Sequence, residues 1–148
     1  MSLSLFGSNI TKEVGALAAF RGFFNLSQAD LTILTGVARA TMSRLENKNE
    51  RAVRADTLVT LLDTFELLGA TIRSDAAGEL TICITPEGIS LGEDMRSLKG
   101  DAKLAYLADY LDYKLESLST ILGKSERDDE LTAACLTSRK RLRSYVGK

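Results

Sequence analysis

The chain has 148 residues, of which 45% are hydrophobic and 26% are charged, and its formal net charge is -1 at pH 7. This composition is typical of a folded globular protein and excludes a disordered or polycationic chain. The sequence contains no histidine, the side chain that most often acts as a general base or metal ligand near neutral pH. It also contains no glycine-rich phosphate loop. We therefore predict that the protein is not an enzyme and uses neither a cofactor nor a metal.

Residues 1–69 have the pattern of a small helical bundle with a common core. Ser27 has a hydroxyl suited to cap the helix that follows it. Gly36 stands where a positive φ would let the chain turn sharply into the next helix, over about residues 38–46. A further helix with apolar residues at helical spacing ends at Gly69. Two short helices joined by a tight turn predict a helix-turn-helix.

After residue 69 the apolar residues alternate, which predicts a β-hairpin over residues 70–86 and a dimer contact there. Residues 87–100 are rich in glycine and follow the chain's single proline, so they are predicted to be a linker. Residues 101–148 carry leucines at helical spacing and predict a helical hairpin that serves for dimerisation or partner binding. The predicted fold class is thus mainly α, with an N-terminal helix-turn-helix bundle, a short β-hairpin and a C-terminal helical hairpin.

The positive charge of the chain is concentrated in one stretch. Between residues 39 and 54, five basic residues are opposed by two acidic ones: Arg39, Arg44, Lys48, Arg51 and Arg54 against Glu46 and Glu50. The outward positions of the predicted helix over residues 38–46 are otherwise small or polar, which would let that helix enter the major groove of DNA. Arg39 can donate to the two acceptors of guanine, and Thr41 can bond a base edge or contact a thymine methyl.

Three segments match a known pattern: "LSQADL", "TGVARATMSRLEN" and "DTLVTLLDTFELLG". With them, residues 11–69 resemble the phage-repressor or Xre-type helix-turn-helix proteins, which implies a lambda-repressor-like fold. The resemblance also implies a structural ion pair between Arg21 and Glu46. The sequence departs from the family at Ala38, where a phosphate-bonding Ser or Thr is frequent. The predicted base contacts are Arg39, Ala40, Thr41, Ser43 and Arg44, and the predicted phosphate contacts are Ser27, Gln28, Lys48, Asn49, Arg51 and Arg54.

These patterns predict a sequence-specific transcriptional regulator, of the repressor kind, that binds double-stranded DNA at a palindromic operator as a homodimer. Since no leader or membrane-spanning run is recognisable, we expect a cytoplasmic protein that does not contact membranes. Two alternatives stay open. One is an antitoxin that binds a toxin and represses its own promoter, because residues 70–85 are similar to the strands of HipB-like antitoxins. The other is a phage interaction module that no longer binds DNA and docks a protein through its C-terminal helices.

Two features of the last third have more than one interpretation. Tyr106, Tyr110 and Tyr113 recur at helical spacing and indicate either a protein interface or packing on the preceding segment. The basic residues between positions 139 and 143 are interpreted as a solvated helix end that complements the helix dipole, in preference to a second DNA contact.

Overall fold

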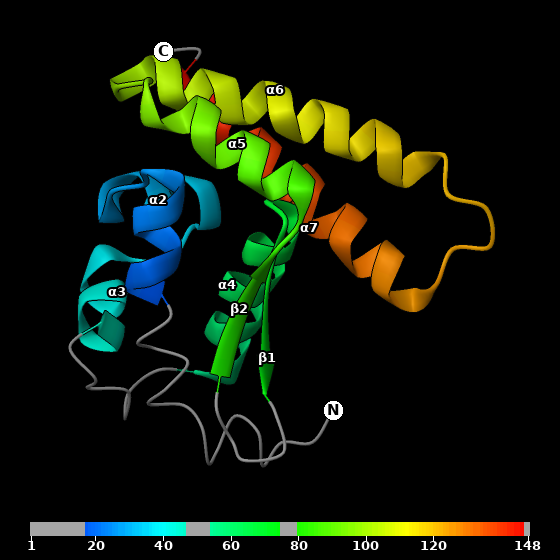
Figure 1. Cartoon of the computed structure of the whole chain (residues 1–148), viewed down its shortest axis with the longest axis horizontal. Coiled ribbons are helices and arrows are strands. Elements are labelled where there is room, and N and C mark those ends of the chain that lie inside the picture. Colours follow the sequence, from blue (N-terminus) through cyan, green and yellow to red (C-terminus); the bar gives the residue numbers. More distant parts are fainter. Residues whose placement is uncertain (1–16, 47–53, 75–79, 147–148) are drawn as a thin grey trace.

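The computed structural model describes residues 17–46, 54–74 and 80–146 (Figure 1). A first helix is described over residues 17–24. The labelled elements that follow are α2 (Gln28–Thr35), α3 (Arg39–Glu46), α4 (Ala55–Leu67), β1 (Ala70–Ser74), β2 (Leu80–Ile84), α5 (Pro86–Arg96), α6 (Gly100–Ser119) and α7 (Glu126–Val146). The described chain is mainly helical with one two-stranded antiparallel sheet, which confirms the predicted fold class. None of the described helices combines the length and the apolar run that a membrane crossing requires.

Local signals set the ends of α2 and the turn into α3. The Ser27 hydroxyl accepts a hydrogen bond from the Asp30 N–H at 3.0 Å, and the Asp30 carboxylate accepts one from the Ser27 N–H at 3.0 Å. This capping box satisfies N–H groups that would otherwise lack partners at the start of α2. At the other end Gly36 has φ 78°, and its N–H donates to the Thr32 carbonyl. The left-handed residue lets α3 begin only three residues later.

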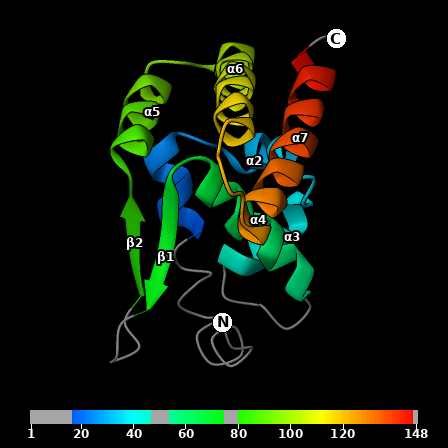
Figure 2. The same cartoon turned by 90° about the vertical axis from the view of Figure 1, so that its right-hand side faces the viewer.

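One apolar core joins the two halves of the chain. Phe20, Met42 and Phe65 lie in its N-terminal part, where the rings of Phe20 and Phe65 stack with centroids 3.8 Å apart. The same core continues through Leu107 of α6 and Leu142 of α7, both fully buried. Figure 2 shows α5, α6 and α7 side by side in that order, with the β-hairpin on the α5 side.

The predicted hairpin is present. β1 and β2 pair antiparallel in a register that runs from Ala70 opposite Ile84 to Ser74 opposite Leu80. Ala70 is buried, and Ile82 and Ile84 pack partly against the core. The sheet therefore gains stability from the helices beneath it, as a two-stranded hairpin needs.

The prediction of a linker over residues 87–100 is wrong, because most of that segment forms α5. The Thr85 hydroxyl caps this helix by accepting from the Gly88 N–H at 3.0 Å, and Pro86 occupies the first helical turn, where its missing N–H costs nothing. The glycines serve packing: a Cβ on Gly92 would lie 2.6 Å from the ring of Phe23. Only residues 97–99 connect α5 to α6.

The predicted C-terminal helical hairpin is formed by α6 and α7. Their connection lies at the end farthest from α2 and α3 (Figure 1). The hairpin also packs on the bundle, because α7 contacts both α2 and α4. Three ion pairs join the hairpin to the bundle. Lys103 of α6 pairs with Asp30 of α2 at 2.9 Å. Arg127 of α7 pairs with Asp63 and Glu66 of α4 at 2.8 and 2.7 Å.

Candidate nucleic-acid interface

The surface of α3 has the two-sided character that the sequence predicts. Met42 and Leu45 point into the core, with exposed fractions of 0% and 1%. The residues at its start, Ala38, Arg39 and Ala40, are exposed. The first turn of α3 contains no acidic side chain. The exposed start of α3 therefore carries small side chains and a positive charge.

Two other predicted base contacts, Thr41 and Arg44, are half-buried and bonded to each other. The Arg44 guanidinium donates to the Thr41 hydroxyl at 3.2 Å. The buried Nε of Arg44 finds no acceptor within the described part of the chain. Thr41 and Arg44 lie two and five residues after Arg39, and both keep a hydrogen that they can donate to DNA, since the guanidinium has further N–H groups and the Thr41 hydroxyl only accepts in this bond.

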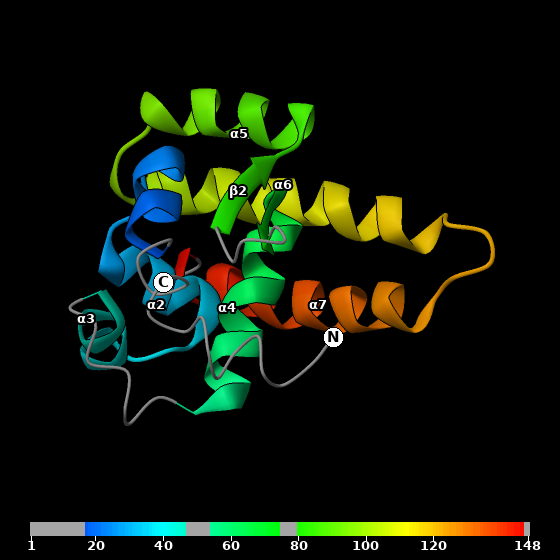
Figure 3. The ribbon, with the colours of Figure 1, turned by 60° about the horizontal axis from the view of Figure 1, so that its bottom comes forward.

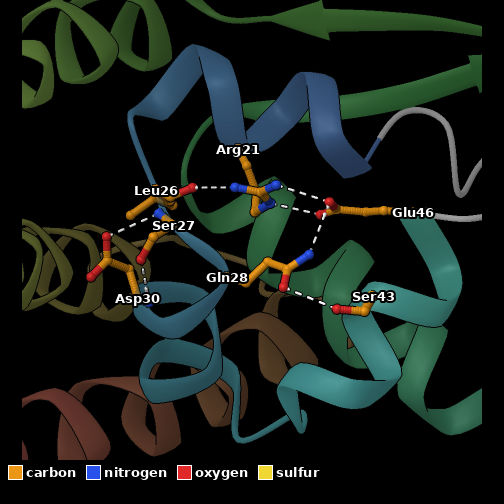
Figure 4. Close-up of polar contacts among 7 residues, drawn as sticks. All are labelled: Arg21, Leu26, Ser27, Gln28, Asp30, Ser43 and Glu46. Carbon is orange, nitrogen blue, oxygen red and sulfur yellow. Dashed lines mark hydrogen bonds and ion pairs between the residues drawn. The ribbon is translucent and has the colours of Figure 1, made fainter.

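Gln28 and Ser43, predicted to contact phosphate and base, are partners in the free protein (Figure 4). The Gln28 amide oxygen accepts from the Ser43 hydroxyl at 3.1 Å, and its amide nitrogen donates to Glu46 at 3.1 Å. An amide nitrogen has two hydrogens to donate, so one stays available for a phosphate. The contacts fix the orientation of Gln28 at the start of α2.

The structure brings Arg21 and Glu46 together, as the resemblance implied. The guanidinium donates to both carboxylate oxygens, with Nε to Oε2 at 2.6 Å and the second nitrogen to Oε1 at 2.8 Å, and it also donates to the Leu26 carbonyl at 2.9 Å. The exposed fractions of the two side chains are 22% and 12%. A bidentate pair in this setting joins the first helix to the end of α3.

The same hydrogen bond from Arg21 lowers the pKa of Glu46 below its ordinary value of 4.5, despite the opposing effect of burial. A lowered folded-state pKa stabilises the fold above the unfolded value, and the contribution is lost as the pH falls through the lower folded value. We therefore expect wild type to be more stable than Glu46→Gln at pH 7, with a difference that shrinks progressively below about pH 4.5. Denaturant unfolding of both proteins across this range measures it, and a difference independent of pH would contradict it.

The remaining predicted phosphate contacts divide into two groups. Lys48, Asn49 and Arg51 lie outside the described residues. Arg54 precedes α4 and pairs with Asp56 at 3.0 Å, but both side chains are mostly exposed, at 80% and 69%. Such a solvated pair is weak, so it would not prevent Arg54 from contacting a phosphate. Ser27, at the start of α2, is exposed as well.

Arg141 is a candidate residue that the sequence interpretation missed. Arg139 and Arg143, which lie two residues before and two residues after it, face α6, where both pair with Asp112. Arg141 lies on another face of α7 and lines a cavity at the turn between α2 and α3. Helical spacing alone places residues 139 and 143 on one face and residue 141 away from them. The spacing gives no indication of what that other face contacts.

The three tyrosines of α6 bond to α5. The Tyr106 hydroxyl donates to Asp94, and the hydroxyls of Tyr110 and Tyr113 donate to the two carboxylate oxygens of Glu87, at 3.1 and 3.0 Å. These bonds account for the tyrosines through packing on the preceding segment, although Tyr113 remains 54% exposed. Among the described residues, no cluster of three His, Cys, Asp or Glu side chains could hold a metal ion.

Comparison of the chain with models of known protein families, with curated proteins and with solved structures gives no match. Membership of the Xre-type family therefore stays a prediction that depends on the sequence segments quoted above.

Proposed function

We propose that the protein is a cytoplasmic, sequence-specific DNA-binding transcriptional regulator, of the repressor kind, that acts as a homodimer. The observation that carries the proposal is the exposed, slim and cationic start of α3, directly after a tight turn from α2. A short helix presented in this way fits the major groove of DNA. Acidic side chains, which phosphates would repel, are missing from the first turn of α3.

In this function α3 contacts bases and α2 contacts the DNA backbone. Arg39 reads a base through its guanidinium, and Ala40 allows the backbone of α3 to approach the groove closely. Gln28 and Ser27, at the start of α2, hold a phosphate of the groove wall. The bond that Gln28 accepts from Ser43 and the bond that it donates to Glu46 hold its side chain in a fixed position relative to α3.

A homodimer follows from the small footprint of one helix. A single α3 reaches only a few base pairs, whereas two copies related by a two-fold axis read two half-sites about 34 Å apart. The operator would then be an inverted repeat.

Selection of bound sequences from a random duplex library tests the proposal. We expect enrichment of an inverted repeat and a log affinity that falls linearly as log salt rises. A library with no enriched sequence, together with affinity that is insensitive to salt, would remove DNA binding as the function.

Replacing Arg39 with Ala should cost about 1–3 kcal/mol at one base-pair position of the enriched site, because one bidentate base contact is lost. Titration against single-base variants of the operator measures this effect. Lys124→Ala is the matched control, since it removes the same charge from an exposed residue in the α6–α7 connection, far from α3. An unchanged base preference in Arg39→Ala would contradict the assignment of Arg39 to base reading.

A further inference from the structure

Arg141 lies directly against the turn that precedes α3. Figure 3 shows the C-terminal end of α7 beside α2, and the two helices are in contact. A Cβ built on Gly36 would lie 2.9 Å from three atoms of the Arg141 guanidinium, Cζ, Nε and Nη2. Glycine at position 36 thus serves two purposes, because it provides the positive φ and leaves room for this guanidinium.

The guanidinium forms one wall of a cavity of about 330 Å³ at the start of α3. The turn from Thr35 to Ala38 and the side chain of Thr41 form a second wall. Asp56, Thr57 and Thr60, in the first turns of α4, form a third. The cavity is therefore bordered by several hydroxyls, by one guanidinium and by the N-terminal ends of two helices.

The charge of this cavity favours an anion. Arg139 and Arg143 are neutralised by acidic residues of α6, whereas no described carboxylate lies within ion-pair distance of Arg141. The one acidic residue in the lining, Asp56, is paired with Arg54 at 3.0 Å and is largely exposed to solvent. Ala38 has no hydroxyl with which to cap α3, and Arg54, at the cap of α4, makes no capping bond with its side chain. Both helix starts add positive potential.

We propose that Arg141 binds a phosphate of the DNA backbone in this cavity, so that the C-terminal helix forms part of the DNA interface. The inference rests on the proposed function. A phosphate of the groove wall fits because the cavity opens beside Ala38 and Thr41, at the end of α3 that would enter the groove. The planar fork of an arginine matches the oxygens of a phosphate. The contact reads no base, so it adds affinity and orientation and leaves sequence preference unchanged.

The test compares Arg141→Gln with Arg143→Gln, which make the same charge change two residues apart on opposite sides of α7. Affinity is measured between about 50 and 200 mM salt, on the selected operator and on a scrambled duplex. We expect Arg141→Gln to weaken binding to both duplexes about tenfold at low salt and to reduce the slope of log affinity against log salt by about one. Arg143→Gln should match wild type. Arg141→Lys keeps the charge and should retain the slope even if it packs less well.

The outcomes separate the inference from the proposed function. If wild type binds DNA with a steep salt slope and Arg141→Gln keeps that slope, the phosphate contact is wrong and the regulator proposal stands. If both glutamine variants lose the same affinity, the effect belongs to overall charge and the Arg141 site is wrong. If wild type itself shows no salt-dependent binding, both proposals fail together.

Discussion

Unfolding of the full chain should follow one transition, with the same midpoint by tyrosine fluorescence and by far-UV circular dichroism. The chain has no tryptophan, and its four tyrosines all lie in α6 and α7, at positions 106, 110, 113 and 145. Tyrosine fluorescence therefore reports on the C-terminal hairpin alone, whereas circular dichroism reports on all helices. Coincident midpoints are the expected behaviour of a single cooperative unit.

We expect a single transition because the N-terminal bundle and the C-terminal helices share one core and supply hydrogen-bond partners to each other. The Lys103 ammonium donates to the Asp30 carboxylate at 2.9 Å and to the Asn25 carbonyl at 2.7 Å. Burial would raise the pKa of Asp30, but the hydrogen bonds from Lys103 and the Ser27 N–H outweigh it and keep this pKa below its ordinary value. The Asn25 amide in turn donates to the carbonyls of Met95 and Leu98. The bundle thus depends on α5 and α6 for its buried polar groups.

A fragment that ends at residue 86 tests the same point more directly, because it lacks α6, α7 and most of α5. Asp30 would then lose its ion-pair partner Lys103, and the apolar side chains of the core that the bundle shares with α6 and α7 would be exposed to water. The ring of Phe23 would lose its contact with Gly92. Against a total stability of about 5–15 kcal/mol, these losses should leave the fragment largely unfolded at 25 °C. A fragment with full helicity and its own cooperative transition, or separate midpoints in the full chain, would show that residues 1–86 form an independent domain.

Local signals in the sequence predicted most of the elements, because each depends on nearby residues. The capping box between Ser27 and Asp30 and the positive φ of Gly36 involve only their own turn. The alternating residues of the hairpin are equally local. α5 was missed because Pro86 and the glycines after it are typical of loops. Their actual role, room for Phe23 beside Gly92, depends on a residue that lies far away in the sequence.

In the candidate site, too, the sequence predicted the features that depend on one helix and not those that depend on how helices pack. The amphipathic pattern of α3 indicated which side chains are exposed, and Arg39 and Ala40 are exposed as it predicted. The hydrogen bond that Ser43 donates to Gln28 depends on how α2 crosses α3, so the residue pattern of neither helix could predict it. The position of Arg141 depends on the path of α7 over α2 and α4. Periodicity within α7 carries no information about that path.

Replacing Glu46 with Ala should lower the free energy of unfolding by about 2–4 kcal/mol. The change leaves the Arg21 guanidinium without a counter-charge, although only 22% of that side chain is exposed to water. It also removes the acceptor of the Gln28 amide. A charge that stays partly buried without its partner costs more than the intact pair contributes, because its desolvation is no longer offset. Denaturant unfolding at neutral pH measures the loss.

A double variant separates this desolvation cost from the value of the pair itself. Arg21→Met with Glu46→Leu removes both charges and keeps comparable side-chain volume, so it should recover much of the stability that Glu46→Ala loses. Asp56→Ala is the control for loss of an acidic partner on the surface, where the pair with Arg54 is exposed and should contribute less than about 1 kcal/mol. If Glu46→Ala costs no more than Asp56→Ala, the Arg21–Glu46 pair behaves as a solvated surface contact. In that case other contacts must orient Gln28 and hold α3 against the first helix.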